Sequence, residues 1–134
     1  GMDIPGLVEV SNANHIIFER NYFRYAGGHG LVFLPFSGYN QIVGNVVADI
    51  SANGIVMDPT SYRDNNECLK DSVYPWMVSE KAMSAFSSGS IYDVIKNNLV
   101  EFCGRDYTDA VGIYASFPDH LLIEHNEIRN LTYS

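Results

Sequence analysis

Apolar and polar residues alternate along short segments of this chain, and one pattern returns four times. In each segment an apolar residue stands three positions before an asparagine, and another stands two positions after it. The asparagines are Asn21, Asn45, Asn98 and Asn126; the apolar residues are Phe18, Ile42, Ile95 and Ile123 before them, and Phe23, Val47, Val100 and Ile128 after them. Short segments rich in Val, Ile, Phe and Tyr, broken by Gly, Asn and Ser, predict β-strands.

The spacing of these segments indicates a repeat. Asn21 and Asn45 are 24 residues apart, and a second marker, a glycine followed by aliphatic residues, keeps step with them. This marker occurs at Gly6, Gly30, Gly54 and Gly112. A fixed period of this size predicts stacked units that bury their apolar faces against each other. No repeated segment sustains a 3.6-residue period, so the pattern predicts an all-β fold, a parallel β-helix with one coil per repeat.

The asparagines interrupt the apolar alternation, so each buried amide needs a partner. Neighbouring strands lie roughly 4.8 Å apart, which places equivalent side chains of successive coils in contact. One amide can then donate to the carbonyl of the next and form a ladder. Because an unpaired buried polar group costs about 1–3 kcal/mol, we expect the four asparagines to form such a ladder.

The asparagine-centred motif with its following Gly-Ile or Gly-Leu resembles the repeats of pectate-lyase-like, carbohydrate-active proteins. The segment DAVGIYASFPDHLLIEHNEIRNLTYS resembles secreted glycoside hydrolases of this fold from Bacteroides-type gut bacteria. The resemblance covers Gly6 to Tyr133 apart from an insertion. It implies a right-handed parallel β-helix of about four coils, a polysaccharide or oligosaccharide ligand, and a secreted, periplasmic or cell-surface location for the parent protein.

Composition narrows the class of protein. The chain has 134 residues, of which 46% are hydrophobic and 18% are charged, as in a single globular domain. Its net charge of −8 and eight scattered Lys and Arg residues exclude a nucleic-acid groove. No apolar run is long enough for a membrane span. The chain begins and ends inside the repeat, so we expect a piece of a longer β-helix, which either self-associates through an open end or stacks its coils between molecules in a crystal.

Neither the cysteines nor the histidines predict a metal or a cofactor. Cys103 occupies an inward position of the repeat, where a buried free thiol is expected, and Cys68 lies in the insertion. The four histidines lack the spacing of a metal-ligand set. We therefore expect no metal and no cofactor.

Two departures from the repeat mark the expected functional region. Gly54 and Asn98 are 44 residues apart, which indicates an insertion of about residues 60–88. Asn98 and Gly112 are 14 residues apart, which adds five residues within the segment 104–110, GRDYTDA. The repeat places both loops at the border of one sheet face, and long loops on a rigid scaffold commonly carry function.

The sheet between these two loops is predicted to have an unusually apolar outer face. Leu7, Leu31, Ile55 and Ile113 are expected to point inward, together with Phe33 and Met57, so that Val8, Val10, Val32 and Val56 point outward. Such a face needs cover, from the insertion, an absent domain or a ligand. The insertion, with a short helix beginning at Ser79, would serve as a plug over this face or as a lid whose aromatic residues stack on a sugar ring.

Candidate chemistry rests on carboxyl groups. Glycoside hydrolysis needs two of them, about 5–5.5 Å apart for retention and about 6.5–9.5 Å apart for inversion. Asp58 and Asp109 border strands at opposite ends, too far apart for a pair unless a loop folds back, whereas Asp106 and Asp109 share a loop that can bring them within pair distance. The alternative is that these aspartates only form turns. The predicted catalytic residues are Asp58, Asp106 and Asp109, and the predicted substrate-binding residues are Arg105, Tyr107, Tyr114 and Trp76.

Two functions from different classes stay open. The first is a fragment of a glycoside hydrolase acting on a plant or host polysaccharide and inactive alone. The second is a non-catalytic module that binds glycan or serves as a structural part of a surface protein. A polysaccharide lyase is disfavoured because the chain has no compact aspartate cluster of the calcium-binding type.

Overall fold

The computed structural model describes residues 4–34, 37–58, 90–116 and 118–132. Short extended segments in these ranges form twelve strands and no helix. The strands are β1 (Gly6–Val10), β2 (Ile17–Glu19), β3 (Tyr22–Ala26), β4 (His29–Phe33), β5 (Gln41–Val43), β6 (Val46–Ile50), β7 (Ile55–Met57), β8 (Val94–Lys96), β9 (Leu99–Cys103), β10 (Ile113–Ala115), β11 (Leu122–Glu124) and β12 (Glu127–Arg129).

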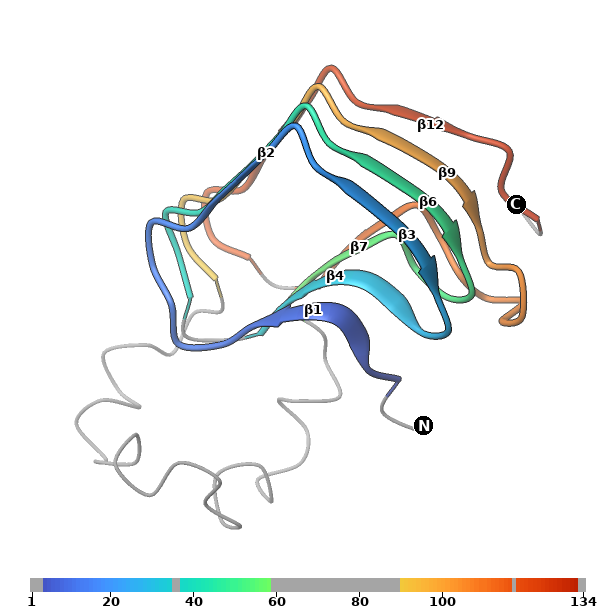
Figure 1. The fold of residues 1–134 in the computed structure, drawn as a ribbon. Helices are drawn as coiled ribbons and strands as arrows, with labels where there is room; N and C mark the ends of the chain where they lie inside the picture. Colours follow the sequence, from blue (N-terminus) through green and yellow to red (C-terminus); the bar gives the residue numbers. More distant parts are fainter. Residues whose placement is uncertain (1–3, 35–36, 59–89, 117, 133–134) are drawn as a thin grey trace, which may run out of the picture.

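The strands build three parallel sheets of four strands each, and every coil contributes one strand to each sheet. The orders are β1-β4-β7-β10, β11-β8-β5-β2 and β12-β9-β6-β3. Figure 1 shows the coils stacked upon one another around a common interior. The prediction of a parallel β-helix with about four coils is confirmed, and its right hand stays a prediction.

The two predicted apolar columns form inside the stack. Phe18, Ile42, Ile95 and Ile123 are successive partners across β2, β5, β8 and β11. Phe23, Val47, Val100 and Ile128 are successive partners across β3, β6, β9 and β12. The middle residues of both columns are fully buried, whereas Ile123 and Ile128 in the last coil are each 45% exposed. The most deeply buried part of the two columns therefore lies in the two middle coils.

The asparagine ladder is confirmed with the predicted residues. Asn98 Oδ1 accepts hydrogen bonds from the backbone N–H of Asn45 at 2.9 Å and from its Nδ2 at 3.0 Å. The same pair of bonds links Asn21 to Asn45 and Asn98 to Asn126. The Nδ2 groups of Asn45, Asn98 and Asn126 also donate to backbone carbonyls of the preceding coil. Asn45 and Asn98 are buried, so the stack pairs amides that would otherwise be orphaned.

The predicted orientation of the first coil is wrong. Leu7 is 49% exposed, whereas Val10 belongs to the core and Val8 packs against it. Gly6 pairs with His29 instead of Gly30, and a one-residue change of register moves every side chain of a strand to the opposite face. The glycine marker is therefore out of register in this coil, although it gives the correct phase for β4 and β7.

The outer face of the first sheet is covered at its centre. Val32 and Val56 do not belong to the core cluster, yet they are only 2% and 1% exposed. The low exposure agrees with an apolar face that is shielded from water, and what shields it stays a prediction. The inserted segment 60–88, with its predicted helix, Cys68 and Trp76, lies outside the described residues.

Candidate functional site

The five extra residues of the third coil form a loop that docks on the coil before it. Gly104 begins this loop with a φ of +77°, a backbone conformation that glycine adopts without strain. Its N–H donates to the Ala52 carbonyl at 3.1 Å, and the N–H groups of Asp106 and Tyr107 donate to the Ser51 carbonyl at 3.1 and 3.2 Å. We call residues 104–110 the docked loop, because these bonds fix its position on the coil beneath.

Asp106 fastens the docked loop with its side chain. Ser51 Oγ donates a hydrogen bond to Asp106 Oδ2 at 2.5 Å, a contact between successive coils. The Asp106 backbone N–H donates to the Ser51 carbonyl as well, so the side chain and the backbone of Asp106 both hold the docked loop on Ser51. This contact links two coils and differs from the local backbone bond of a turn-forming aspartate, and a catalytic role for Asp106 stays a prediction.

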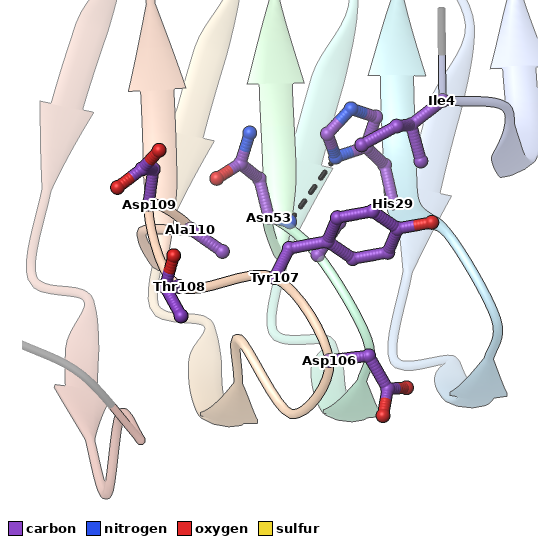
Figure 2. A pocket seen from close by; sticks show the side chains of 9 residues that line it. Ile4, His29, Asn53, Asp106, Tyr107, Thr108, Asp109 and Ala110 are labelled. Atoms are coloured by element: carbon purple, nitrogen blue, oxygen red, sulfur yellow. Dashed lines mark hydrogen bonds between the residues drawn. The ribbon is translucent and has the colours of Figure 1, made fainter. Parts of the chain in front are cut away.

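The docked loop borders an open depression of about 360 Å³, which we call the loop depression. Its wall comes from three coils, with side chains that converge from β4, from the turn before β7 and from the docked loop (Figure 2). The lining residues are Ile4, His29, Ala52, Asn53, Asp106, Tyr107, Thr108, Asp109 and Ala110.

His29 presents a fixed tautomer to this depression. The Asn53 backbone N–H donates to His29 Nδ1 at 3.1 Å, as the dashed line in Figure 2 shows. Burial lowers the pKa of His29, and the negative charge of Glu9 offsets this effect only in part. His29 is therefore neutral at neutral pH, and its one ring proton sits on Nε2, because the lone pair of Nδ1 already accepts a hydrogen bond.

Asn53 and Asp109 supply further polar groups. Asn53 Oδ1 accepts a hydrogen bond from the Val111 N–H at 2.7 Å, which orients the amide and leaves both Nδ2 hydrogens without an acceptor among the described residues. Asp109 is exposed and makes no hydrogen bond or ion pair within the described ranges. The depression thus offers amide donors and a carboxylate acceptor.

Of the seven predicted site residues, three line the loop depression: Asp106, Tyr107 and Asp109. Figure 2 shows the carboxylates of Asp106 and Asp109 at different ends of the docked loop, pointing away from each other. Asp58 lies elsewhere: it is fully buried and follows β7, whereas Asp109 precedes β10, the parallel neighbour of β7. Tyr114 lies within β10 and outside the depression, and Trp76 falls outside the described residues.

Arg105 borders a second depression of about 280 Å³ on the other side of Asp106. Asp49 lies between two arginines there: Arg24 Nη2 donates to Oδ2 at 2.8 Å, and Arg105 Nη1 donates to Oδ1 at 3.4 Å. The Arg24 guanidinium also lies 4.9 Å from the centre of the Tyr25 ring. The charge of Arg105 is thus partly balanced by a carboxylate of the preceding coil.

The sequence reasoning did not find His29 and Asn53. Both lie at turns, and neither belongs to a recognisable motif. Their separation of 24 residues equals one repeat, and this spacing could have predicted that they lie on adjacent coils beside the docked loop.

The remaining side chains supply little further chemistry. Cys103 is a free, buried thiol, as predicted, and burial raises its pKa to about 12. Within the described ranges no group of three or more His, Cys, Asp or Glu side chains could hold a metal ion. The part of the chain that the structure describes contains no helix able to span a membrane.

Comparison with protein-family models, with curated proteins and with solved structures finds no match.

Proposed function

We propose that this chain is part of a carbohydrate-active β-helix protein and that the loop depression binds a glycan. The observation that carries the proposal is the meeting of three kinds of group in one open depression. They are neutral N–H donors, a free carboxylate and an exposed aromatic ring. A sugar presents hydroxyl groups that both donate and accept, together with an apolar ring face.

Each group suits part of such a ligand. Asp109 accepts from a hydroxyl, while His29 Nε2–H and the Asn53 amide donate to one. The Tyr107 side chain is 37% exposed and offers a ring surface at the border of the depression. The depression is open, which fits a segment of an oligosaccharide or polysaccharide, because a chain needs room to enter and leave at both ends.

The geometry supports binding more directly than hydrolysis. Asp106 is occupied by Ser51 and points away from Asp109, so the described residues do not present two facing carboxyl groups. Asp109 is the acid that is available for chemistry. Glycoside hydrolase activity stays a prediction that needs a second carboxyl group beside Asp109.

Tyr107→Ala is expected to weaken glycan binding about tenfold, which corresponds to about 1.4 kcal/mol of lost ring contact. Asp109→Asn should weaken it by a similar factor, since the amide accepts a weaker hydrogen bond than the carboxylate. Isothermal titration calorimetry with neutral plant and host oligosaccharides measures both effects. Tyr22→Ala is the matched control, because Tyr22 is 74% exposed on β3 and outside the depression. Equal affinities for Tyr107→Ala, Tyr22→Ala and the unchanged chain would contradict the proposal.

A separate assay addresses the hydrolase prediction. Release of reducing ends from polysaccharides and of chromophore from aryl glycosides should be absent for the chain alone, because one carboxyl group is insufficient for either hydrolytic course. Turnover that Asp109→Asn abolishes would show instead that the catalytic pair is complete.

A further inference from the structure

A second row of buried polar groups runs through the stack, beside the turns that precede β2, β5 and β8. Asn40 Oδ1 accepts the N–H of Ile16 at 2.9 Å, and the N–H of Asn40 donates to Asp93 Oδ1 at 2.8 Å. As in the asparagine ladder, a side-chain Oδ1 of one coil accepts a backbone N–H of the preceding coil. In this row, however, the third coil carries an aspartate where the second carries an asparagine.

The second oxygen of Asp93 has no partner among the described residues. Asp93 is 1% exposed, and no described group donates a hydrogen bond to its Oδ2. The hydroxyl of Ser90, three residues earlier, is also buried and has no hydrogen-bond partner in the described part of the chain. A buried carboxylate oxygen with no donor is costly, because burial disfavours the charge and nothing replaces the lost water.

An asparagine has its Nδ2 donor at the point where Asp93 has Oδ2. Asn45 Nδ2 donates to the Phe18 carbonyl at 2.8 Å, and Asn40 Nδ2 lies 3.5 Å from the Ala13 carbonyl. The register places the Ser37 carbonyl at the equivalent point for Asp93, since Gly38 pairs with Ile91. A carboxylate cannot donate to this carbonyl, but a protonated carboxylic acid has one O–H donor and can.

We propose that folding holds Asp93 as a neutral carboxylic acid, whose proton replaces the amide hydrogen of the ladder and makes the third coil sensitive to pH. The protonated carboxyl group stabilises the contact between the second and third coils. Loss of the proton leaves a buried anion between the second and third coils.

The surroundings favour the neutral form. Burial raises the pKa of Asp93, and the polar groups of Asn40 and of nearby Ser90 offset this effect only in part. On the coil after Asp93, Asp119 and His120 pair with each other at 2.6 Å, with side chains 50% and 60% exposed. The other charged side chains of the adjoining strands are Glu19 on β2, Lys96 on β8 and Glu124 on β11, and β5 carries none. None of these charged groups is among the causes of the raised pKa, so no cation of the described residues stabilises the anion.

The sign of the effect follows from the raised pKa. The ordinary value is 3.8, and the folded protein holds the proton more tightly than the unfolded chain does. The stabilisation is therefore complete at pH values below 3.8 and is lost as pH rises through the folded pKa. Between these two values one proton is released on unfolding, so the unfolding equilibrium constant increases about tenfold per pH unit from this group.

Asp93→Asn tests the proposal, because asparagine keeps the donor at every pH. Urea unfolding midpoints of the full chain would be measured from pH 4 to pH 8. The midpoint of Asp93→Asn should exceed that of the unchanged chain at pH 8, and the difference should shrink toward zero near pH 4. Asp119→Asn is the matched control and should follow the unchanged chain at pH 8, because Asp119 is half exposed on the next coil. Parallel profiles for Asp93→Asn and the unchanged chain would overturn the proposal.

A direct titration keeps the proposal testable if Asp93→Asn does not fold. Carbon-13 NMR of the unchanged chain should show the Asp93 carboxyl titrating above 3.8, and local hydrogen exchange at the Asn40 amide should accelerate over the same pH range. An Asp93 carboxyl that titrates at or below 3.8 would refute the neutral form.

Discussion

Gly30→Ala is expected to lower the free energy of unfolding by at least about 3 kcal/mol, at the upper end of the usual cost of overpacking. A Cβ atom at Gly30 would lie 2.3 Å from the Gly54 carbonyl oxygen and 2.8 Å from a methyl group of Val47. The oxygen belongs to the backbone and accepts the N–H of Leu31 at 2.9 Å, so it cannot move without breaking the ladder of the first sheet. The coils would have to separate locally.

Gly27→Ala is the matched control for this substitution, because a Cβ atom at Gly27 meets nothing within 4 Å. It should change the free energy of unfolding by less than about 0.5 kcal/mol, as surface substitutions usually do. Urea denaturation of both variants at one pH gives the comparison. A Gly30→Ala variant as stable as Gly27→Ala would show that the coils are stacked less closely than described.

Asn98→Ala is expected to destabilise the fold by about 3 kcal/mol, because at least two buried groups lose their partners at roughly 1–3 kcal/mol each. Asn98 Oδ1 accepts the N–H of Asn45 at 2.9 Å, and its Nδ2 donates to the Ile42 carbonyl at 2.8 Å. Both bonds are buried, so water cannot replace the missing amide. Asn45→Ala should have an effect in the range of about 1–3 kcal/mol, because its partner Asn21 is exposed.

Gln41→Ala is the control for the ladder, since Gln41 carries an exposed amide on β5. Thermal unfolding of Asn98→Ala and Gln41→Ala should differ clearly in midpoint. Equal thermal shifts for the two variants would refute a stabilising role for the ladder.

The sequence predicted the interior well, because the interior follows a strict periodicity. Strand alternation has a period of two, and Asn45 lies one repeat after Asn21, so columns and ladder follow from residue spacing alone. The predicted side-chain orientation of the first coil was wrong, because Gly6 has the sequence context of Gly30 but pairs with His29. A marker residue fixes the phase of a strand only where its register is also known.

The residues that line the loop depression were predicted in part. Tyr107 and Asp109 were found because the break in the repeat placed an insertion there. His29 and Asn53 were missed, because only the stacking of coils brings them beside the docked loop. The role of Asp106 depends on its contact with Ser51, which no local pattern of residues reveals.

The most direct test of the proposed glycan site is to map ligand-induced shifts in the amide resonances of the full chain. Neutral oligosaccharides that bind in calorimetry would be titrated into isotope-labelled protein. We expect the largest shifts at His29, Asn53 and residues 107–110, with little change at Tyr22 on β3. Shifts confined to other surfaces, or no shift with any oligosaccharide of the panel, would contradict a glycan site in the loop depression.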